Sequence, residues 1–128
     1  MIQRLAFVEV VVRDFDAALA WYTKVLGFKL SGAITSNEDG RWCQLVTTEG
    51  DDRLALWRPS WTPNLEGKSQ PSFIPVFAVH DLRTLVDRLA ADQVTLLEGI
   101  RERADYRITT IADPEGNRLQ LFETTTSA

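Results

Sequence analysis

The chain has 128 residues, of which 45% are hydrophobic and 25% are charged. This composition is typical of a single globular domain and excludes an intrinsically disordered chain. Lys and Arg number 14 against 18 Asp and Glu, so the formal charge of −4 argues against a nucleic-acid partner, which would require a basic surface.

The first half of the chain predicts a strand, a helix and three further strands. Side chains of residues 7–12 alternate between two faces of a predicted strand. Val8, Val10 and Val12 share one face, and Phe7, Glu9 and Val11 share the other. Asp14 can cap the helix that follows, in which apolar residues recur at helical spacing, and Gly27 can end it. Three more strands are predicted at residues 28–34, 41–47 and 53–57.

The second half predicts the same order of elements. A strand over residues 73–79 precedes a helix over residues 82–91, which Asp81 can cap. Strands are then predicted at residues 94–98, 106–112 and 118–122. The last two are joined by a turn in which Pro114 presets φ and Gly116 can adopt the left-handed conformation.

The two halves repeat each other in sequence. Val12-Arg13-Asp14-Phe15 returns 67 positions later as Val79-His80-Asp81-Leu82, and Leu54-Ala55-Leu56 returns after 65 positions as Leu119-Gln120-Leu121. Residues 58–72 between the halves are rich in Pro and Ser, as in a connector. We therefore expect two βαβββ modules, residues 1–57 and 73–128. Each is small for a module that folds alone, so we expect them to form one structural domain.

No segment predicts a signal peptide or a membrane span. Glu9 interrupts the apolar N-terminal run, and the apolar stretch over residues 73–79 contains Pro75. Both are far shorter than the ~20 residues needed to cross a bilayer. We expect a cytoplasmic protein without a membrane partner, a location that also suits the unpaired thiol of Cys43.

The repeated pattern resembles the vicinal oxygen chelate superfamily. The resemblance rests on Val12-Arg13-Asp14, Trp21-Tyr22, Leu26-Gly27-Phe28 and the turn Asp113-Pro114-Glu115-Gly116-Asn117, and it extends from about residue 5 to residue 123. This superfamily includes glyoxalase I, extradiol dioxygenases, fosfomycin resistance enzymes and bleomycin-binding proteins. The resemblance implies an α+β fold in which two βαβββ modules form a U-shaped mixed sheet with a concave ligand trough, and it implies a homodimer.

The positions that hold a metal in this superfamily are altered here. Metal-using members place His or Gln seven residues before the capping Asp of each half, and most often Glu in the last strand of each half. The matching residues are Phe7, Ile74, Ala55 and Gln120, of which only Gln120 carries an oxygen. Catalytic metal sites usually need about three protein ligands, so we expect no metal and no other cofactor.

The single histidine and the single cysteine add no alternative site. His80 lies beside the capping Asp81, where an exposed loop position is expected. Cys43 lies in a predicted strand and is expected to be a buried, structural thiol. One cysteine also excludes an internal disulfide, and one histidine excludes any site that needs two imidazoles from one chain.

We expect the concave trough to be apolar and aromatic, with few polar groups, as ligand sites usually are. Its lining comes from the side of the first strand that carries no core valine and from the equivalent side of the strand that contains residue 74. The last strand of each half adds further residues. Trp42 and Trp61 are further aromatic candidates, although packing in the core or at a dimer interface would explain the tryptophans equally well. The predicted ligand-binding residues are Phe7, Glu9, Ala55, Trp57, Ile74, Arg107, Gln120 and Phe122.

Two charged residues of this set have alternative roles. Glu9 lies in a Val-rich strand, so it either pairs with Arg53, Arg118 or Arg107, which we favour, or receives a cationic ligand group, or acts as a catalytic base. Arg107 lies six residues before Asp113, where many relatives carry an Arg, but the Gly that precedes that Arg in relatives is absent.

The leading hypothesis is a metal-independent small-molecule-binding protein of the glyoxalase/bleomycin resistance type that sequesters an aromatic or cationic compound. Trp57 and Phe122 would stack on the ligand, and Glu9 and Gln120 would orient it. The alternative is an enzyme of the glyoxalase or dioxygenase type, a lyase, isomerase or dioxygenase, which works without metal with Glu9 as base or has an unrecognised metal site. A regulatory or scaffolding module is the third possibility, because one fold hosts many functions.

Overall fold

The computed structural model describes residues 1, 6–50, 53–60 and 74–125, so Trp61 and Phe73 lie outside the described residues. The chain divides into two compact units, Met1–Lys68 and Ser69–Ala128, and each is described by itself below. The division falls inside the predicted connector, residues 58–72.

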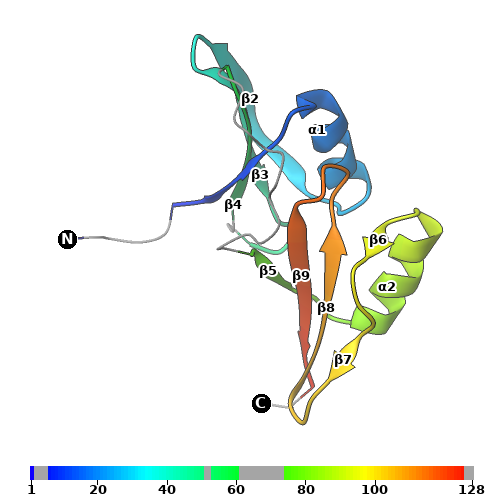
Figure 1. The fold of residues 1–128 in the computed structure, drawn as a ribbon. Coiled ribbons are helices and arrows are strands. Elements are labelled where there is room, and N and C mark those ends of the chain that lie inside the picture. The colour runs from blue at the N-terminus through cyan, green and yellow to red at the C-terminus, as the bar shows by residue number, and fades with distance from the viewer. Residues whose placement is uncertain (2–5, 51–52, 61–73, 126–128) are drawn as a thin grey trace. The chain divides into compact units, whose positions relative to one another are not determined.

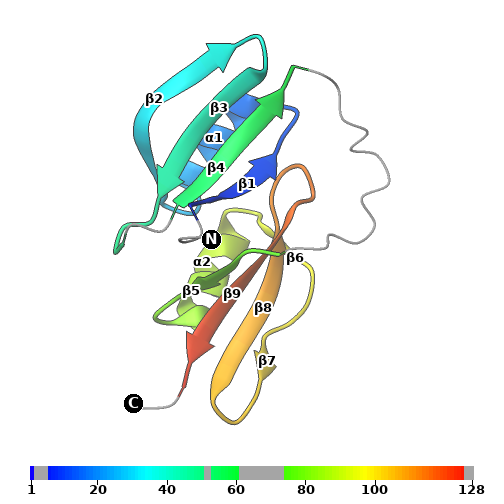
Figure 2. The ribbon, with the colours of Figure 1, turned by 90° about the vertical axis from the view of Figure 1, so that its left-hand side faces the viewer.

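The first unit is a four-stranded mixed sheet with one helix. Its elements are β1 (Val8–Val11), α1 (Phe15–Lys24), β2 (Lys29–Asn37), β3 (Gly40–Val46) and β4 (Arg53–Pro59). The strand order is β1-β4-β3-β2, with β1 parallel to β4 and the other neighbours antiparallel. Helix α1 packs on one face of this sheet (Figure 1). Figure 2 views the sheet from its other face, so the strands lie in front of the helix.

Strand alternation gives the first unit its core. Every second side chain of β1, β3 and β4 points to the helix side, where a set of residues is buried under α1. This set comprises Val10, Val12, Phe15, Ala18, Tyr22, Cys43, Leu45, Leu54 and Leu56. Burial raises the pKa of the Cys43 thiol, which keeps it protonated and unreactive.

The second unit repeats this arrangement. It contains β5 (Val76–Ala78), α2 (Leu82–Ala91), β6 (Thr95–Leu96), β7 (Arg101–Glu102), β8 (Tyr106–Ala112) and β9 (Arg118–Thr124). The strand order is β5-β9-β8-β6, with β5 parallel to β9, and β7 also pairs with β8. Helix α2 covers one face of this sheet (Figure 1). Neither helix of the described chain has the length and apolar character needed to span a membrane.

Several element boundaries differ from the sequence prediction. Strand β5 begins at Val76 because Pro75 has no N–H to donate to the ladder, although its carbonyl accepts from Gln120 N at 2.9 Å. Strand β4 continues to Pro59, two residues into the predicted connector. The single strand predicted at residues 94–98 is replaced by two-residue β6, and β7 was not predicted. The α+β class is confirmed. The order β-α-β-β-β is found in the first unit, whereas β7 adds a fifth strand to the second.

Two side chains fix the N-terminal end of α2 within its unit. Asp81 caps the helix, as predicted, by accepting from Thr84 N at 3.1 Å and from Thr84 Oγ1 at 2.8 Å. Glu123 of β9 accepts from Leu82 N at 2.8 Å, so a strand residue satisfies a second free N–H of the first helical turn. The helix is therefore held to the sheet by hydrogen bonds as well as by its apolar face.

The cap predicts a pH-dependent contribution to stability. Hydrogen bonds from the backbone N–H and the hydroxyl of Thr84 hold the pKa of the Asp81 carboxyl below its ordinary value of 3.8. Such a group stabilises the fold fully above its unfolded-state pKa, and the contribution is lost as the pH falls through the lower folded-state pKa. We expect Asp81→Ala to lower Tm at neutral pH and the difference from wild type to vanish in acid.

Thermal unfolding followed by circular dichroism over this pH range measures the difference. Asp87→Ala is the matched control, because it removes an exposed carboxylate from the same helix without removing a cap. A deficit of Asp81→Ala that stays constant down to strongly acidic pH would contradict the assignment of the cap to the ionised carboxylate.

Gly40 predicts a second, larger effect on stability. It has φ of +134°, and a Cβ at this position would overlap the carbonyl oxygen of Arg58 and lie 2.9 Å from Pro59 Cα. We therefore expect Gly40→Ala to lower the free energy of unfolding by about 2 kcal/mol. Chemical denaturation measures it, with Gly99→Ala as control because no atom lies within 4 Å of that Cβ. Equal, small losses in both variants would contradict the close approach.

Candidate functional site

The face of the first sheet that α1 does not cover carries several of the predicted ligand-binding residues. Cross-strand register aligns Glu9 with Ala55 and Gln44, and aligns Val11 with Trp57 and Trp42. These residues alternate with the buried core residues, so they point away from α1. We call this surface the open face of the first unit, defined by Phe7, Glu9, Val11, Trp42, Gln44, Ala55 and Trp57.

Aromatic side chains dominate one end of this open face. Trp42 and Trp57 are directly opposite one another on β3 and β4, and both are half-buried. Phe7 packs edge-to-face on Trp42, with ring centroids 5.7 Å apart and an interplanar angle of 65°. Phe7 and Trp57 were predicted to line the ligand site and Trp42 was a further aromatic candidate; all three lie on the same face of this sheet.

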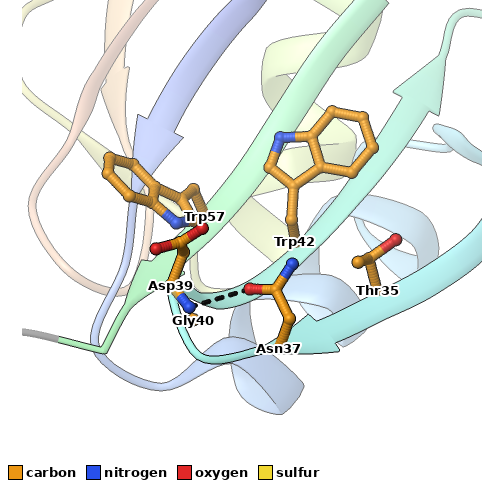
Figure 3. A pocket seen from close by; sticks show the side chains of 6 residues that line it. All are labelled: Thr35, Asn37, Asp39, Gly40, Trp42 and Trp57. Atoms are coloured by element: carbon orange, nitrogen blue, oxygen red, sulfur yellow. Dashed lines mark hydrogen bonds between the residues drawn. The ribbon is translucent and has the colours of Figure 1, made fainter.

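A pocket of about 240 Å³ lies between the tryptophans and the turn that joins β2 to β3. Figure 3 shows the indoles of Trp42 and Trp57 standing beside the strands, with Asn37 and Asp39 near the turn. The pocket is lined by Thr35, Asn37, Asp39, Gly40, Trp42 and Trp57. Sequence reasoning missed its β2 and turn residues, because only the pairing of β2 with β3 brings Thr35 opposite Trp42.

The structure gives Glu9 a different environment from the one favoured above. Its side chain is exposed, and among the described residues of this unit no Arg pairs with it. Arg53 instead donates from Nη1 to Gln44 Oε1 at 3.2 Å. Ala55, directly beside Glu9 in the register, has no exposed surface, so it forms the floor of the open face and its neighbours form the accessible surface.

The second unit has an equivalent open face, on the side of its sheet away from α2. Val76 and Ala78 of β5 align with Gln120 and Phe122 of β9, and Val76 is 52% exposed. Gln120 Nε2 donates to Thr110 Oγ1 at 3.3 Å. Phe122 contacts Tyr106, with ring centroids 5.5 Å apart. Ile74 lies just before β5 and is half-buried. Because it precedes Val76 by two positions, it belongs to the same face of the sheet as Val76.

Arg107 does not join Gln120 and Phe122. In the register it lies opposite Glu123, one position before Ile108, which pairs with Phe122, so it belongs to the other face of β8. Its Nε donates to Glu102 at 3.1 Å and its Nη1 donates to Glu123 at 3.3 Å. Its contacts in this structure are ion pairs that connect β7, β8 and β9.

The residues at the superfamily's metal positions do not fit a metal ion. Phe7, Ala55 and Ile74 have no electron pair to donate, so the neutral amide oxygen of Gln120 is the one donor at these four positions. No group of three or more His, Cys, Asp or Glu side chains that could hold a metal ion occurs in the described part of the chain. His80 is exposed beside the cap of α2. No chemical step through a metal can therefore be derived from these residues.

Comparison with known families identifies the class of protein. Residues 4–121 match the Glyoxalase/Bleomycin resistance protein/Dioxygenase superfamily, so the chain belongs to this superfamily. The resemblance drawn from the sequence motifs is thereby confirmed. A comparison with curated proteins gives no match.

Solved structures are similar over nearly the whole chain. A glyoxylase/bleomycin resistance protein/dioxygenase domain from Frankia sp. EAN1pec has a TM-score of 0.82 and 20% identity, covering 100% of this chain and 96% of that one. TnmS3, an antibiotic binding protein from Streptomyces sp. CB03234, has a TM-score of 0.78 and 25% identity, covering 97% and 98%. The fosfomycin resistance protein FosX from Listeria monocytogenes has a TM-score of 0.75 and 12% identity, covering 98% and 96%.

The altered metal positions predict a specific result with divalent ions. Because a ligand that binds the folded state raises Tm increasingly with its concentration, we expect Mn²⁺, Fe²⁺, Ni²⁺ and Zn²⁺ to cause no such concentration-dependent rise in Tm. Metal analysis of the purified protein is expected to find less than stoichiometric metal, and chelator treatment is expected to leave Tm unchanged. Stoichiometric metal, or a large rise in Tm with metal concentration, would instead support the hypothesis of a metalloenzyme.

Proposed function

We propose that this protein is a metal-independent small-molecule-binding protein that holds a planar aromatic ligand on the open face of the first unit. The observation that carries the proposal is the pair Trp42 and Trp57, opposite one another beside a pocket of about 240 Å³. Two indoles on adjacent strands offer a large, rigid apolar surface at low entropic cost, because each side chain has only two rotatable bonds.

The surroundings of the tryptophans support ligand binding over simple core packing. Both indoles lie on the side of the sheet away from α1, where they are only partly buried, whereas the core tyrosine Tyr22 is fully buried under the sheet. Exposed aromatic surface with a few nearby polar groups is typical of sites for organic ligands. Glu9, which forms no ion pair with the described residues of its unit, and Gln44 are the polar groups that would orient a ligand there.

The antibiotic-binding relative supports sequestration as the mode of action. TnmS3 is described as an antibiotic binding protein, and it is similar to this chain over almost the full length of both. A binder of this kind needs stacking surface and a few anchors, and it needs no reacting group. Ile74, Gln120 and Phe122 of the second unit stay ligand-binding residues predicted from the sequence. A homodimer in the cytoplasm, without nucleic-acid or membrane partners, stays a prediction from sequence.

Tryptophan substitutions test the proposal directly. We expect planar aromatic compounds, screened without added metal, to quench tryptophan fluorescence in a saturable manner. Trp57→Leu and Trp42→Leu are each expected to weaken binding of a hit by roughly tenfold, as the loss of one stacking partner implies. Trp21→Phe, on α1 away from the open face, is the matched control and is expected to bind normally. Calorimetry is the readout for all variants, because substitution changes the fluorescence signal itself.

The same hits distinguish a binder from an enzyme. A sequestering protein returns the compound chemically unchanged after long incubation, which mass spectrometry can establish. Turnover that is abolished by Glu9→Gln in a correctly folded variant would instead support Glu9 as a base. Unchanged affinity in both tryptophan variants would refute the proposed location of the site.

A further inference from the structure

Resting on the proposed function, we infer that the turn between β2 and β3 forms a subsite for a positively charged group of the ligand. Asp39 is the counter-ion in this subsite, and Trp42 and Trp57 supply the aromatic faces. The ligand class is therefore a planar aromatic cation, or an aromatic compound that carries an ammonium or similar group. Glu9, for which a cationic ligand group was one of the alternatives drawn from the sequence, is not among the pocket's lining residues.

The composition of the pocket indicates its preference for charge. Of the six residues that line it, Asp39 alone is ionisable, and the other polar side chains are those of Thr35 and Asn37. Figure 3 shows Asp39 on the same side of the pocket as Trp57. An indole face attracts a cation through its quadrupole, and a carboxylate attracts it through charge, so both features favour the same ligand group.

The Asp39 carboxylate is available to a ligand. Among the described residues, no Lys, Arg or His forms an ion pair with it. The nearest Arg in sequence, Arg41, is engaged elsewhere. Its Nη1 pairs with Asp16 at 3.0 Å, and its guanidinium carbon lies 4.8 Å from the centroid of the Phe15 ring. Arg41 therefore faces α1, on the opposite side of β3 from Trp42.

The backbone of Asp39 is held in place before any ligand arrives. Its N–H donates to Asn37 Oδ1 at 2.8 Å, and its carbonyl accepts from Ser60 N at 2.9 Å. The adjacent Gly40 brings the turn so close to Arg58 that a Cβ would not fit. A carboxylate on a backbone fixed from two sides loses little conformational entropy on binding, which favours a real subsite over a freely moving surface charge.

Two probes of nearly equal size test the preference for charge. N-methylquinolinium carries a permanent positive charge, whereas a quinoline with its methyl group on carbon is neutral at a pH above its own pKa. We expect the cation to bind several-fold more tightly than the neutral probe in calorimetric titrations. Asp39→Asn is expected to weaken cation binding roughly threefold to fivefold, as an exposed charge pair implies, and to leave the neutral probe unaffected.

Glu38→Gln is the matched control. It removes the same charge from the neighbouring exposed position in the turn, but Glu38 does not line the pocket. Equal weakening of cation binding in both variants would mean that only the overall charge matters, and it would overturn the inference. A wild-type protein that binds the two probes equally, or binds neither, would also overturn it.

These outcomes separate the inference from the proposed function. If the cation and the neutral probe bind equally and Trp57→Leu weakens both, the aromatic site stands and the charged subsite falls. If Trp57→Leu and Trp42→Leu leave the binding of every hit unchanged, the proposed function falls as well. The salt concentration offers a further readout. Raising it is expected to weaken binding of the cationic probe to the wild-type protein but not to Asp39→Asn.

Discussion

The pairing of β3 with β4 is the constraint on which the candidate site depends. Trp42 lies opposite Trp57, and the next pair along the same strands, Cys43 and Leu56, lies in the core. Because side chains alternate, a slip of one residue would bury the indoles and expose the core, so hydrophobic burial itself selects the register. Gly40 holds the same pairing at its turn end, where a side chain would collide with β4. Core and pocket are thus two results of one alignment.

Most of the fold could be predicted from local patterns in the sequence. The bounds of α2 and β8 agree with the prediction, because a capping Asp and a regular apolar spacing are encoded within the segment itself. The strand predicted at residues 94–98 contains β6, but its short length and the existence of β7 could not be predicted. Each has only two residues, too few for an alternating pattern. Besides pairing with β8, β7 is held by a contact of Glu102 with Arg83 of α2, 19 residues away in the sequence.

The candidate site was predictable only in part. Alternation along β1 was sufficient to assign Phe7 and Glu9 to the face away from the core. It could not tell which side chains from other strands would meet them, since strand register is a long-range property. For the same reason Arg107 was grouped with residues of the opposite face, and Asp39 was not among the predicted ligand-binding residues. Family resemblance helped with the fold, but the altered metal positions left the ligand to be argued from the local chemistry.

The double attachment of Glu123 has a consequence for local motions of the second unit. One of its carboxylate oxygens accepts from the first amide of α2, and the other accepts from Arg107 of β8. The Leu82 amide can therefore exchange its hydrogen with solvent only when the Glu123 carboxylate releases it, and the bond to Arg107 opposes that release. Two segments 41 residues apart in sequence, a helix start and a strand end, then open as one cooperative unit.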